Sequence, residues 1–137
     1  MKVFLDSSAL VKRYIFEVGT PELMKACHDA SRIILSVITA IEIPSAFARR
    51  LREGALSKAQ YKTIKENFSK DLAASDIVEL YPAVIRQAVR SLEKYPLRSL
   101  DAIQVASALI ADVDLFITSD ERQRNAARKL KLKTILI

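Results

Sequence analysis

The stretch MKVFLDSS, residues 1–8, decides how the rest of the chain is interpreted. Residues 3–5 form a short apolar run without polar alternation, which is typical of a strand buried on both faces of a parallel sheet. The run ends at Asp6, and helix-forming residues follow. Asp6 is therefore expected at the carboxyl end of a central strand, the edge where open α/β sheets bind ligands. Asp is also a preferred helix cap, so a purely structural role for Asp6 stays open at this point.

The composition is that of a globular protein, with 137 residues, half of them apolar and 28% charged. This length favours one domain covering residues 1–137. Only two glycines are present, which argues against a Gly-rich phosphate loop and its nucleotide chemistry.

The single cysteine excludes an intramolecular disulfide and fits a reducing cytoplasm. No apolar run reaches the ~20 residues of a membrane span, so a soluble cytoplasmic protein without membrane contact is expected. The net charge of +6 favours an anionic partner such as nucleic acid.

Apolar runs and helical patterns alternate along the chain. Further strands are expected at residues 33–35, 76–80, 115–117 and 134–137. Helices are expected over residues 7–15, from Thr20, from Ser36 to Arg52 with Pro44 inside, from Ser57, from Pro82, from Ser99 and over residues 121–130. Gly54 is expected to end the third of these helices. The helix after Pro82 has Ile85, Ala88, Val89 and Leu92 on one face. This order predicts an α/β fold with a central parallel sheet of about four to five strands and helices on both faces.

Four acids fall at related places in this pattern. Asp6 ends the first strand, Glu42 lies about two turns into the helix after the second, Asp101 is in the first turn after Ser99, and Asp120 ends the fourth strand. The carboxyl ends of parallel strands meet at one edge, so these carboxylates can converge. Converging carboxylates repel one another, and a divalent cation removes that repulsion. Oxygen-rich sites suit Mg²⁺ or Mn²⁺, so the pattern predicts metal-dependent phosphodiester hydrolysis.

Each acid also has a structural interpretation. Asp101 and Asp120 are placed where acids stabilise helix starts through the dipole. Glu42 has apolar neighbours and needs a partner, because a lone buried charge is costly. Other kinds of site fit less well: His28 is the only histidine and Cys27 the only cysteine, which excludes a Cys/His zinc site and disfavours a Ser-His-Asp triad.

The acids lie in four short motifs: VFLDSSAL at residues 3–10, TAIEI at 39–43, LRSLDAIQVA at 97–106 and FITSD at 116–120. In their order and spacing, these motifs resemble the PIN-domain ribonucleases, and within them the VapC-type toxins of toxin–antitoxin pairs. The resemblance covers nearly all of the chain. Pro44, two residues after Glu42, departs from the expected pattern.

The resemblance implies a PIN-like three-layer fold and endonucleolytic cleavage of RNA by a metal-activated water. It implies that Mg²⁺ or Mn²⁺ is held by the four catalytic acids, which match Asp6, Glu42, Asp101 and Asp120. Ser8 and Thr118 match polar positions that orient the acids or the metal's water ligands. The resemblance also implies a homodimer and inhibition by a cognate antitoxin protein.

Basic residues beside the motifs are candidates for contacts to the RNA backbone: Arg98, Arg122 and Lys12. Such contacts give affinity without sequence choice and weaken with salt. A solvated basic face is the alternative, and the run Arg49, Arg50 and Arg52 could equally pair with an acidic partner protein.

Two other functions stay open at this stage. A PIN-type nuclease could act in RNA processing or repair instead of as a toxin. A PIN-like domain could also bind RNA or protein without catalysis, although retention of all four acids counts against that. A phosphoacceptor receiver module fits poorly, because a single acid, Asp6, follows the first strand.

Overall fold

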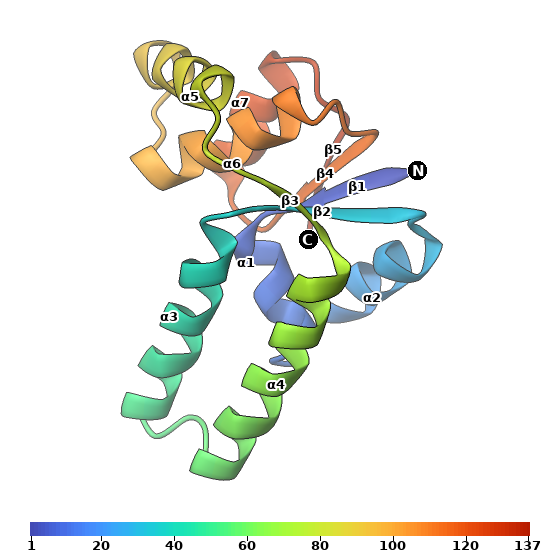
Figure 1. Cartoon of the computed structure of the whole chain (residues 1–137), viewed down its shortest axis with the longest axis vertical. Helices are drawn as coiled ribbons and strands as arrows, with labels where there is room; N and C mark the ends of the chain where they lie inside the picture. The colour runs from blue at the N-terminus through green and yellow to red at the C-terminus, as the bar shows by residue number, and fades with distance from the viewer.

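Five parallel strands form one sheet in the order β3-β2-β1-β4-β5 in the computed structural model, which describes all of residues 1–137 (Figure 1). The strands are β1 (Lys2–Leu5), β2 (Arg32–Ser36), β3 (Asp76–Val78), β4 (Leu115–Thr118) and β5 (Thr134–Leu136). The central position predicted for the first strand is confirmed: in β1, Val3 lies opposite Ile33 of β2 and Leu115 of β4. The predicted parallel sheet is also confirmed.

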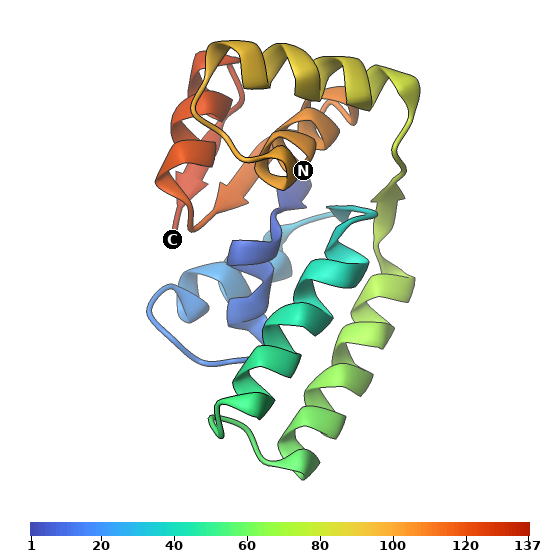
Figure 2. The same ribbon diagram turned by 90° about the vertical axis from the view of Figure 1, so that its left-hand side faces the viewer.

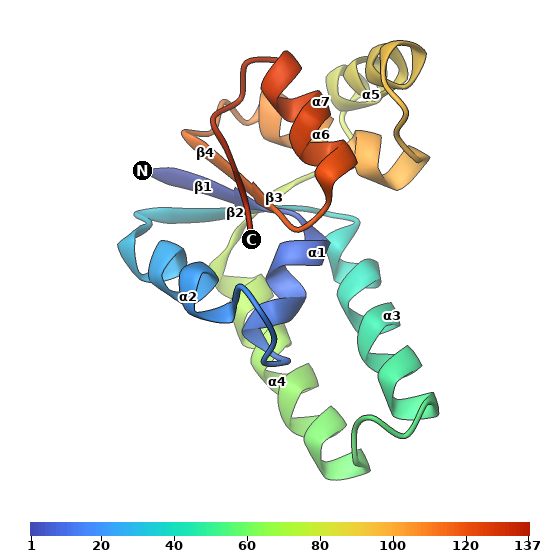
Figure 3. The ribbon, with the colours of Figure 1, turned by 180° about the vertical axis from the view of Figure 1, so that it is seen from behind.

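Helices cover both faces of the sheet, which gives three layers (Figures 1 and 3). One face carries α1 (Ser7–Leu10), the 3-10 helix η1 (Val11–Arg13), α2 (Thr20–Asp29), α3 (Thr39–Arg52) and α4 (Lys58–Ala74), and the other carries α5 (Pro82–Lys94), α6 (Ser99–Ile110) and α7 (Glu121–Lys129). Crossovers between parallel strands are right-handed. The chain moves outward from β1 to β3 and then returns past β1 to β4 and β5, so the two sets of connecting helices fall on opposite faces.

The side chains of β1 alternate between two cores. Val3 and Leu5 pack with α1, α2, α3 and α4, whereas Phe4 packs with α5, α6 and α7. The Phe4 ring stacks on Phe116 with 5.7 Å between the ring centroids. Each fully buried side chain of this size stabilises the fold by about 1.5–3 kcal/mol. The uninterrupted apolar run of β1 is therefore explained, because neither face of the strand meets water.

The helices α3 and α4 form a long hairpin that extends away from the sheet (Figure 2). Ser57 starts α4 with a capping box: its hydroxyl accepts from the Gln60 amide at 3.1 Å, and the Gln60 side chain accepts from the Ser57 amide at 2.9 Å. Gly54 follows the end of α3 with a φ of +75°, as predicted for a C-terminal glycine. Pro44 does not interrupt α3.

The helix starts predicted at Thr20 and Ser99 are confirmed for α2 and α6, although neither residue caps its helix, and the start predicted at Ser36 is wrong. Gly19, not Thr20, precedes α2, and the Thr20 hydroxyl donates to the Lys12 carbonyl at 2.9 Å. Ser36 still belongs to β2, so α3 begins at Thr39. Arg98, not Ser99, is the residue before α6. For α3 the start depends on how far β2 pairs with its neighbours, because a helix can begin only where the chain leaves the strand.

The apolar face predicted for the helix after Pro82 is also wrong in part. Ile85, Val89 and Leu92 of α5 are 43%, 49% and 39% exposed, whereas Val84, Ala88 and Ser91 face the core. The sheet below α5 is already covered by α6, so α5 packs mainly against α6 through its small residues. None of the helices is long and apolar enough to cross a membrane.

Candidate active site

The four acids lie at the carboxyl edge of the sheet, near its topological switch point. The chain leaves β1 toward β2 on one side, and β4 lies on the other side of β1, so a crevice is expected where β1 and β4 end. Asp6 directly follows β1, and Asp120 is the residue before α7. Asp101 is in the first turn of α6, and Glu42 is in the first turn of α3 rather than two turns in.

Asp6 is the most deeply buried of these acids, with only 1% of its surface exposed. Its carboxylate accepts hydrogen bonds from the Ala9 amide at 2.9 Å, the Ser8 hydroxyl at 2.8 Å and the Thr118 hydroxyl at 2.9 Å. Asp6 is thus the helix cap of α1 and a member of the acid cluster at once. The Ala9 amide donates to Oδ1, the Thr118 hydroxyl donates to Oδ2, and the Ser8 hydroxyl lies 2.8 Å from both oxygens.

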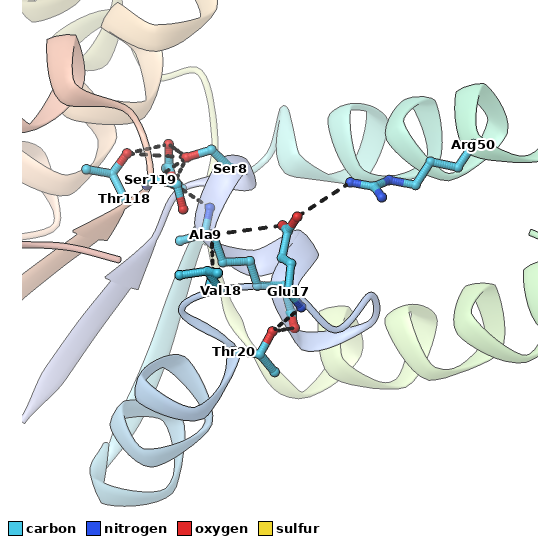
Figure 4. A network of polar contacts seen from close by, with 10 residues as sticks. Ser8, Ala9, Glu17, Val18, Thr20, Arg50, Thr118 and Ser119 are labelled. Atoms are coloured by element: carbon cyan, nitrogen blue, oxygen red, sulfur yellow. Dashed lines mark hydrogen bonds and ion pairs between the residues drawn. The ribbon is translucent and has the colours of Figure 1, made fainter. Parts of the chain in front are cut away.

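The two hydroxyls also fix the turn between β4 and α7. Ser8 Oγ accepts from the Ser119 amide at 3.0 Å, and Thr118 Oγ1 accepts from the Asp120 amide at 3.0 Å. Figure 4 shows Ser8, Thr118 and Ser119 converging from two segments that are more than 100 residues apart. Each hydroxyl therefore orients Asp6 and also sets the position of the segment that carries Asp120.

The acids act on one another electrostatically. Burial, and to a smaller extent the charge of Asp120, raise the pKa of Asp6 to about 7 against the lowering effect of its three hydrogen bonds. Burial and the charge of Asp120 likewise raise the pKa of Asp101. Asp120 therefore lies close enough to Asp6 and to Asp101 for its negative charge to raise the pKa of both carboxyl groups.

Glu42 joins this edge through a buried glutamine. Its Oε1 accepts from the Gln104 amide nitrogen at 2.8 Å and from the Ser7 hydroxyl at 2.9 Å. Gln104 lies one turn after Asp101 on α6 and is 1% exposed. The partner that the sequence analysis required for Glu42 is thus an amide from another helix, together with Ser7.

A second buried glutamine holds Asp101. Gln123 of α7 is 3% exposed and donates its side-chain amide to Asp101 Oδ1 at 3.0 Å, while its backbone N–H donates to Asp120 Oδ1 at 3.0 Å. Sequence reasoning missed both glutamines. A signal was present: Gln104 and Gln123 each follow an acid by three residues, the spacing that places two side chains on one helical face.

The residues present fit a hard divalent cation. All side chains of the cluster that could bind a metal do so through oxygen, which suits Mg²⁺ or Mn²⁺. Three buried oxygens beside the acids have no hydrogen-bond partner: Ser119 Oγ, Gln104 Oε1 and Gln123 Oε1. No three His, Cys, Asp or Glu side chains lie close enough to form a complete ligand set. The four acids therefore share one edge of the sheet, where Asp120 acts electrostatically on both Asp6 and Asp101. Glu42 is linked to Asp101's helix through Gln104.

The predicted RNA-contact residues differ in how accessible they are. Arg98 and Arg122 are exposed. The Lys12 side chain is only 11% exposed, and its ammonium donates to the Val18 carbonyl at 2.6 Å. Lys12 therefore holds the loop before α2 and is not free to contact a phosphate. A cavity of about 660 Å³ lies between α2 and α4, and none of the four acids lines it.

Comparisons with known proteins agree with the geometry. The family model described as PIN domain matches residues 3–129. Ribonuclease VapC35 of Mycobacterium tuberculosis is 29% identical over 139 residues, which cover 97% of this chain and 95% of that protein. Ribonuclease VapC45 of the same species is 30% identical over 123 residues, which cover 88% of this chain and 85% of that protein.

Solved structures share the fold at low identity. FitAcB from Neisseria gonorrhoeae has a TM-score of 0.75 at 14% identity and covers 97% of this chain and 96% of its own. The toxin VapC20 of Mycobacterium tuberculosis, described as cleaving the sarcin-ricin loop, has a TM-score of 0.70 at 12% identity and covers 90% and 94%. The similarity to both structures extends over almost the entire length of each chain.

Proposed function

This chain belongs to the PIN-domain family, and we propose that it is an endoribonuclease, the toxin component of a VapBC-type toxin–antitoxin pair. The family resemblance read from the four acidic motifs is thereby confirmed. Two features of the relatives support the proposal: proteins similar in sequence over most of the chain are ribonucleases, and structural neighbours include toxin–antitoxin complexes. The chain would act as a single PIN-like domain in the cytoplasm.

One observation carries the proposal: at the carboxyl edge of the central strands, the charge of Asp120 acts on the buried carboxylate of Asp6 and on that of Asp101. A protein gains no stability by gathering like charges in a dry site. Such an arrangement is explained by chemistry that needs a cation there. When bound at this edge, Mg²⁺ or Mn²⁺ would activate a water molecule and stabilise the charge that develops on a phosphodiester.

The chain's own residues then have separate roles. Asp6, Asp101, Asp120 and Glu42 would hold the metal. Ser8 and Thr118 keep Asp6 in one orientation by donating to its carboxylate. Gln104 and Gln123 are positioning residues, because each donates a buried amide to an acid and cannot itself exchange a proton.

Two protein partners belong to the proposal. The first is a cognate antitoxin that covers the acidic edge and blocks cleavage. The second is another copy of the chain, for which the exposed apolar side chains of α5 offer a surface: Ile85, Val89 and Leu92. Three apolar residues on one exposed helical face are more readily explained by a protein contact than by a monomer in water.

The test is cleavage of RNA by the purified protein with and without Mg²⁺, followed by mapping of the cut ends. Asp6→Asn and Asp101→Asn are expected to lose cleavage while keeping the fold, and Glu93→Gln, an exposed acid on α5, serves as the matched control. Cleavage by the Asp6 variant at the parent rate would disprove the role given to Asp6. Calorimetric titration with Mn²⁺ separates an enzyme from a domain that only binds RNA. Mn²⁺ binding by the parent and not by Asp6→Asn is the result expected of the enzyme.

A further inference from the structure

The net charge of the chain is concentrated in the outer part of the α3–α4 hairpin. We name residues 45–70 the basic arm. It contains seven basic residues and two acids, so it carries +5 of the net +6 of the whole chain. The basic residues are Arg49, Arg50, Arg52, Lys58, Lys62, Lys65 and Lys70. The other 111 residues are close to electrically balanced, so the arm is a distinct feature of this protein.

The basic arm extends from the body into solvent (Figure 2). Phe68 is the only buried residue of α4, and Phe47 is the last buried residue of α3. All seven basic side chains lie on these two helices, and six of the residues are exposed. The arm thus presents charge along its length, and only its root is packed against the rest of the fold.

Almost none of this charge is neutralised within the chain. Arg50 alone reaches a carboxylate, that of Glu17 at 3.9 Å (Figure 4). The other six basic residues form no ion pair within the protein. Lys58, Lys62 and Lys65 follow one another at helical spacing, so like charges lie on one face of α4, which destabilises a helix slightly. Folding does not explain this pattern, whereas a polyanionic ligand would.

The charge begins close to the acidic edge. Arg49 lies seven residues after Glu42 on α3, which places it two turns further on the same helical face, about 10 Å along the axis. Arg52 lies about 15 Å from Glu42 by the same rise. The helix that presents Glu42 therefore leads directly into the basic arm.

The surface chemistry of the arm fits a nucleic-acid backbone better than a protein partner. Protein interfaces have an apolar core with buried aromatic or aliphatic anchors. No exposed large apolar side chain lies in residues 45–70, although thirteen occur elsewhere in the chain. Tyr61 is half-buried and lies beneath Lys65, whose ammonium is 5.4 Å from the centre of the ring. The arm presents positive side chains at regular intervals, and Lys and Arg side chains of this kind bind the phosphate groups of a nucleic acid.

We propose that the basic arm binds the sugar–phosphate backbone of the RNA substrate, outside the nucleotides that are cleaved. This inference rests on the proposed ribonuclease function and deepens it. It assigns the substrate class: RNA long enough to extend from the acidic edge along the α3–α4 hairpin. A short oligonucleotide that spans only the scissile bond would miss these contacts and would bind weakly.

The test uses a triple variant of the α4 stripe, Lys58→Gln with Lys62→Gln and Lys65→Gln. The matched control is Arg128→Gln with Lys131→Gln and Lys133→Gln, which removes three exposed charges near the far end of α7 and the start of β5. Both variants change the net charge of the protein equally, so only the position of the charge differs. Circular dichroism and thermal melting establish that both variants fold.

Binding is measured by fluorescence anisotropy with a labelled RNA of about 30 nucleotides, on an Asp6→Asn background so that the RNA stays intact. Loss of three phosphate contacts is expected to weaken binding about 10- to 100-fold at 0.1 M salt and to reduce the slope of log K against log salt by about 2. The α7 control is expected to match the parent. In cleavage assays, the stripe variant is expected to show a higher KM on the long RNA, and the difference from the parent should shrink on a hexanucleotide.

Unchanged affinity and salt slope in the stripe variant would overturn the proposal, even if the parent cleaves RNA normally. Equal losses in the stripe variant and the α7 control would also overturn it, because net charge would then be the cause. Retained RNA binding with lost binding to the antitoxin would assign the arm to a protein partner instead. Failure of the parent to cleave RNA would count against the proposed function, while the anisotropy experiment would still decide on the arm.

Discussion

Replacing Asp6 by asparagine is expected to abolish RNA cleavage and, at the same time, to make the metal-free protein more stable. Asparagine keeps the shape of the side chain and an oxygen that can accept from the Ala9 amide at the start of α1. The substitution removes the negative charge that burial and Asp120 disfavour. It also removes the charge that the proposed chemistry requires. Activity and stability should therefore change in opposite directions.

The magnitude follows from the raised pKa. A pKa of about 7 in place of the ordinary 3.8 means that ionised Asp6 lowers the free energy of unfolding by up to about 4 kcal/mol above pH 7. Asparagine recovers only part of this, because its amide group meets two hydroxyls that now donate to the carboxylate, at about 1 kcal/mol each. The expected net gain is about 2 kcal/mol. For a chain of 137 residues, this corresponds to an increase in Tm of about 7 °C.

The pH dependence has a definite sign. Well below the unfolded pKa of 3.8, Asp6 is neutral in both the folded and the unfolded parent, so the ionisation penalty is absent. There the variant should be less stable than the parent by about 2 kcal/mol, the cost of the two hydroxyl hydrogen bonds. As the pH rises from 4 to 7, the unfolded parent ionises Asp6 while the folded parent resists ionisation, and the parent loses stability relative to the variant. Above pH 7 the difference should stay constant.

The assay is thermal and urea unfolding of both proteins in EDTA from pH 4 to 8, with Glu93→Gln as the exposed control. Addition of Mn²⁺ at pH 7.5 should stabilise the parent and not the Asp6 variant, because only the parent would bind the ion. A variant that is no more stable than the parent at pH 8 would show that burying this carboxylate carries no energetic penalty. No electrostatic cost at Asp6 would then favour a cation at this edge.

Three further predictions concern the surrounding structure. Gln104→Leu removes the amide that holds Glu42 and should lower kcat and Mn²⁺ affinity about 10- to 100-fold with little change in Tm; parent-like values would reduce Gln104 to a packing residue. Phe47→Ala, at a site with 0% exposure, should lower the free energy of unfolding by about 3–5 kcal/mol in urea, and a loss below 1 kcal/mol would contradict the packing described. For Asp71, burial raises the pKa, but hydrogen bonds from Arg13 and a tyrosine hydroxyl outweigh it, and the net shift is downward. The ionised carboxylate of Asp71 therefore stabilises the fold above its unfolded pKa, and this stabilisation is lost as the pH falls toward the lower folded pKa. The free energy of unfolding of the Asp71→Asn variant should thus change less between pH 5 and 3 than that of the parent.

Local features of the fold could be read from the sequence because they depend on neighbouring residues. The apolar run of residues 3–5 predicted a central strand, and β1 lies in the middle of the sheet. Ser57 and Gly54 were predicted to start and end helices of the hairpin, and both do so. Capping boxes and C-terminal glycines are completed within about four residues, so no distant part of the chain can change them.

Features that depend on packing could not be read in the same way. The spacing of Ile85, Ala88, Val89 and Leu92 predicted an apolar face. Of these only Ala88 is buried, beside Val84, and the three larger side chains are exposed. Periodicity shows which side chains share a face and says nothing about which face meets the core. Lys12 likewise resembled a phosphate-binding residue until the fold placed its ammonium against the Val18 carbonyl.

In the candidate site, too, some features follow from the sequence and others depend on packing. The sequence by itself determined that acids follow two strands and lie in two of the helices, and this order was enough to predict that they share one edge of a parallel sheet and to predict the type of chemistry. Only the tertiary structure decided which acid is buried, that Asp120 influences both Asp6 and Asp101, and that Gln104 and Gln123 hold two of the carboxylates. Burial and electrostatic coupling depend on distances between segments up to 112 residues apart, and such distances exist only once the sheet and its helices have packed together.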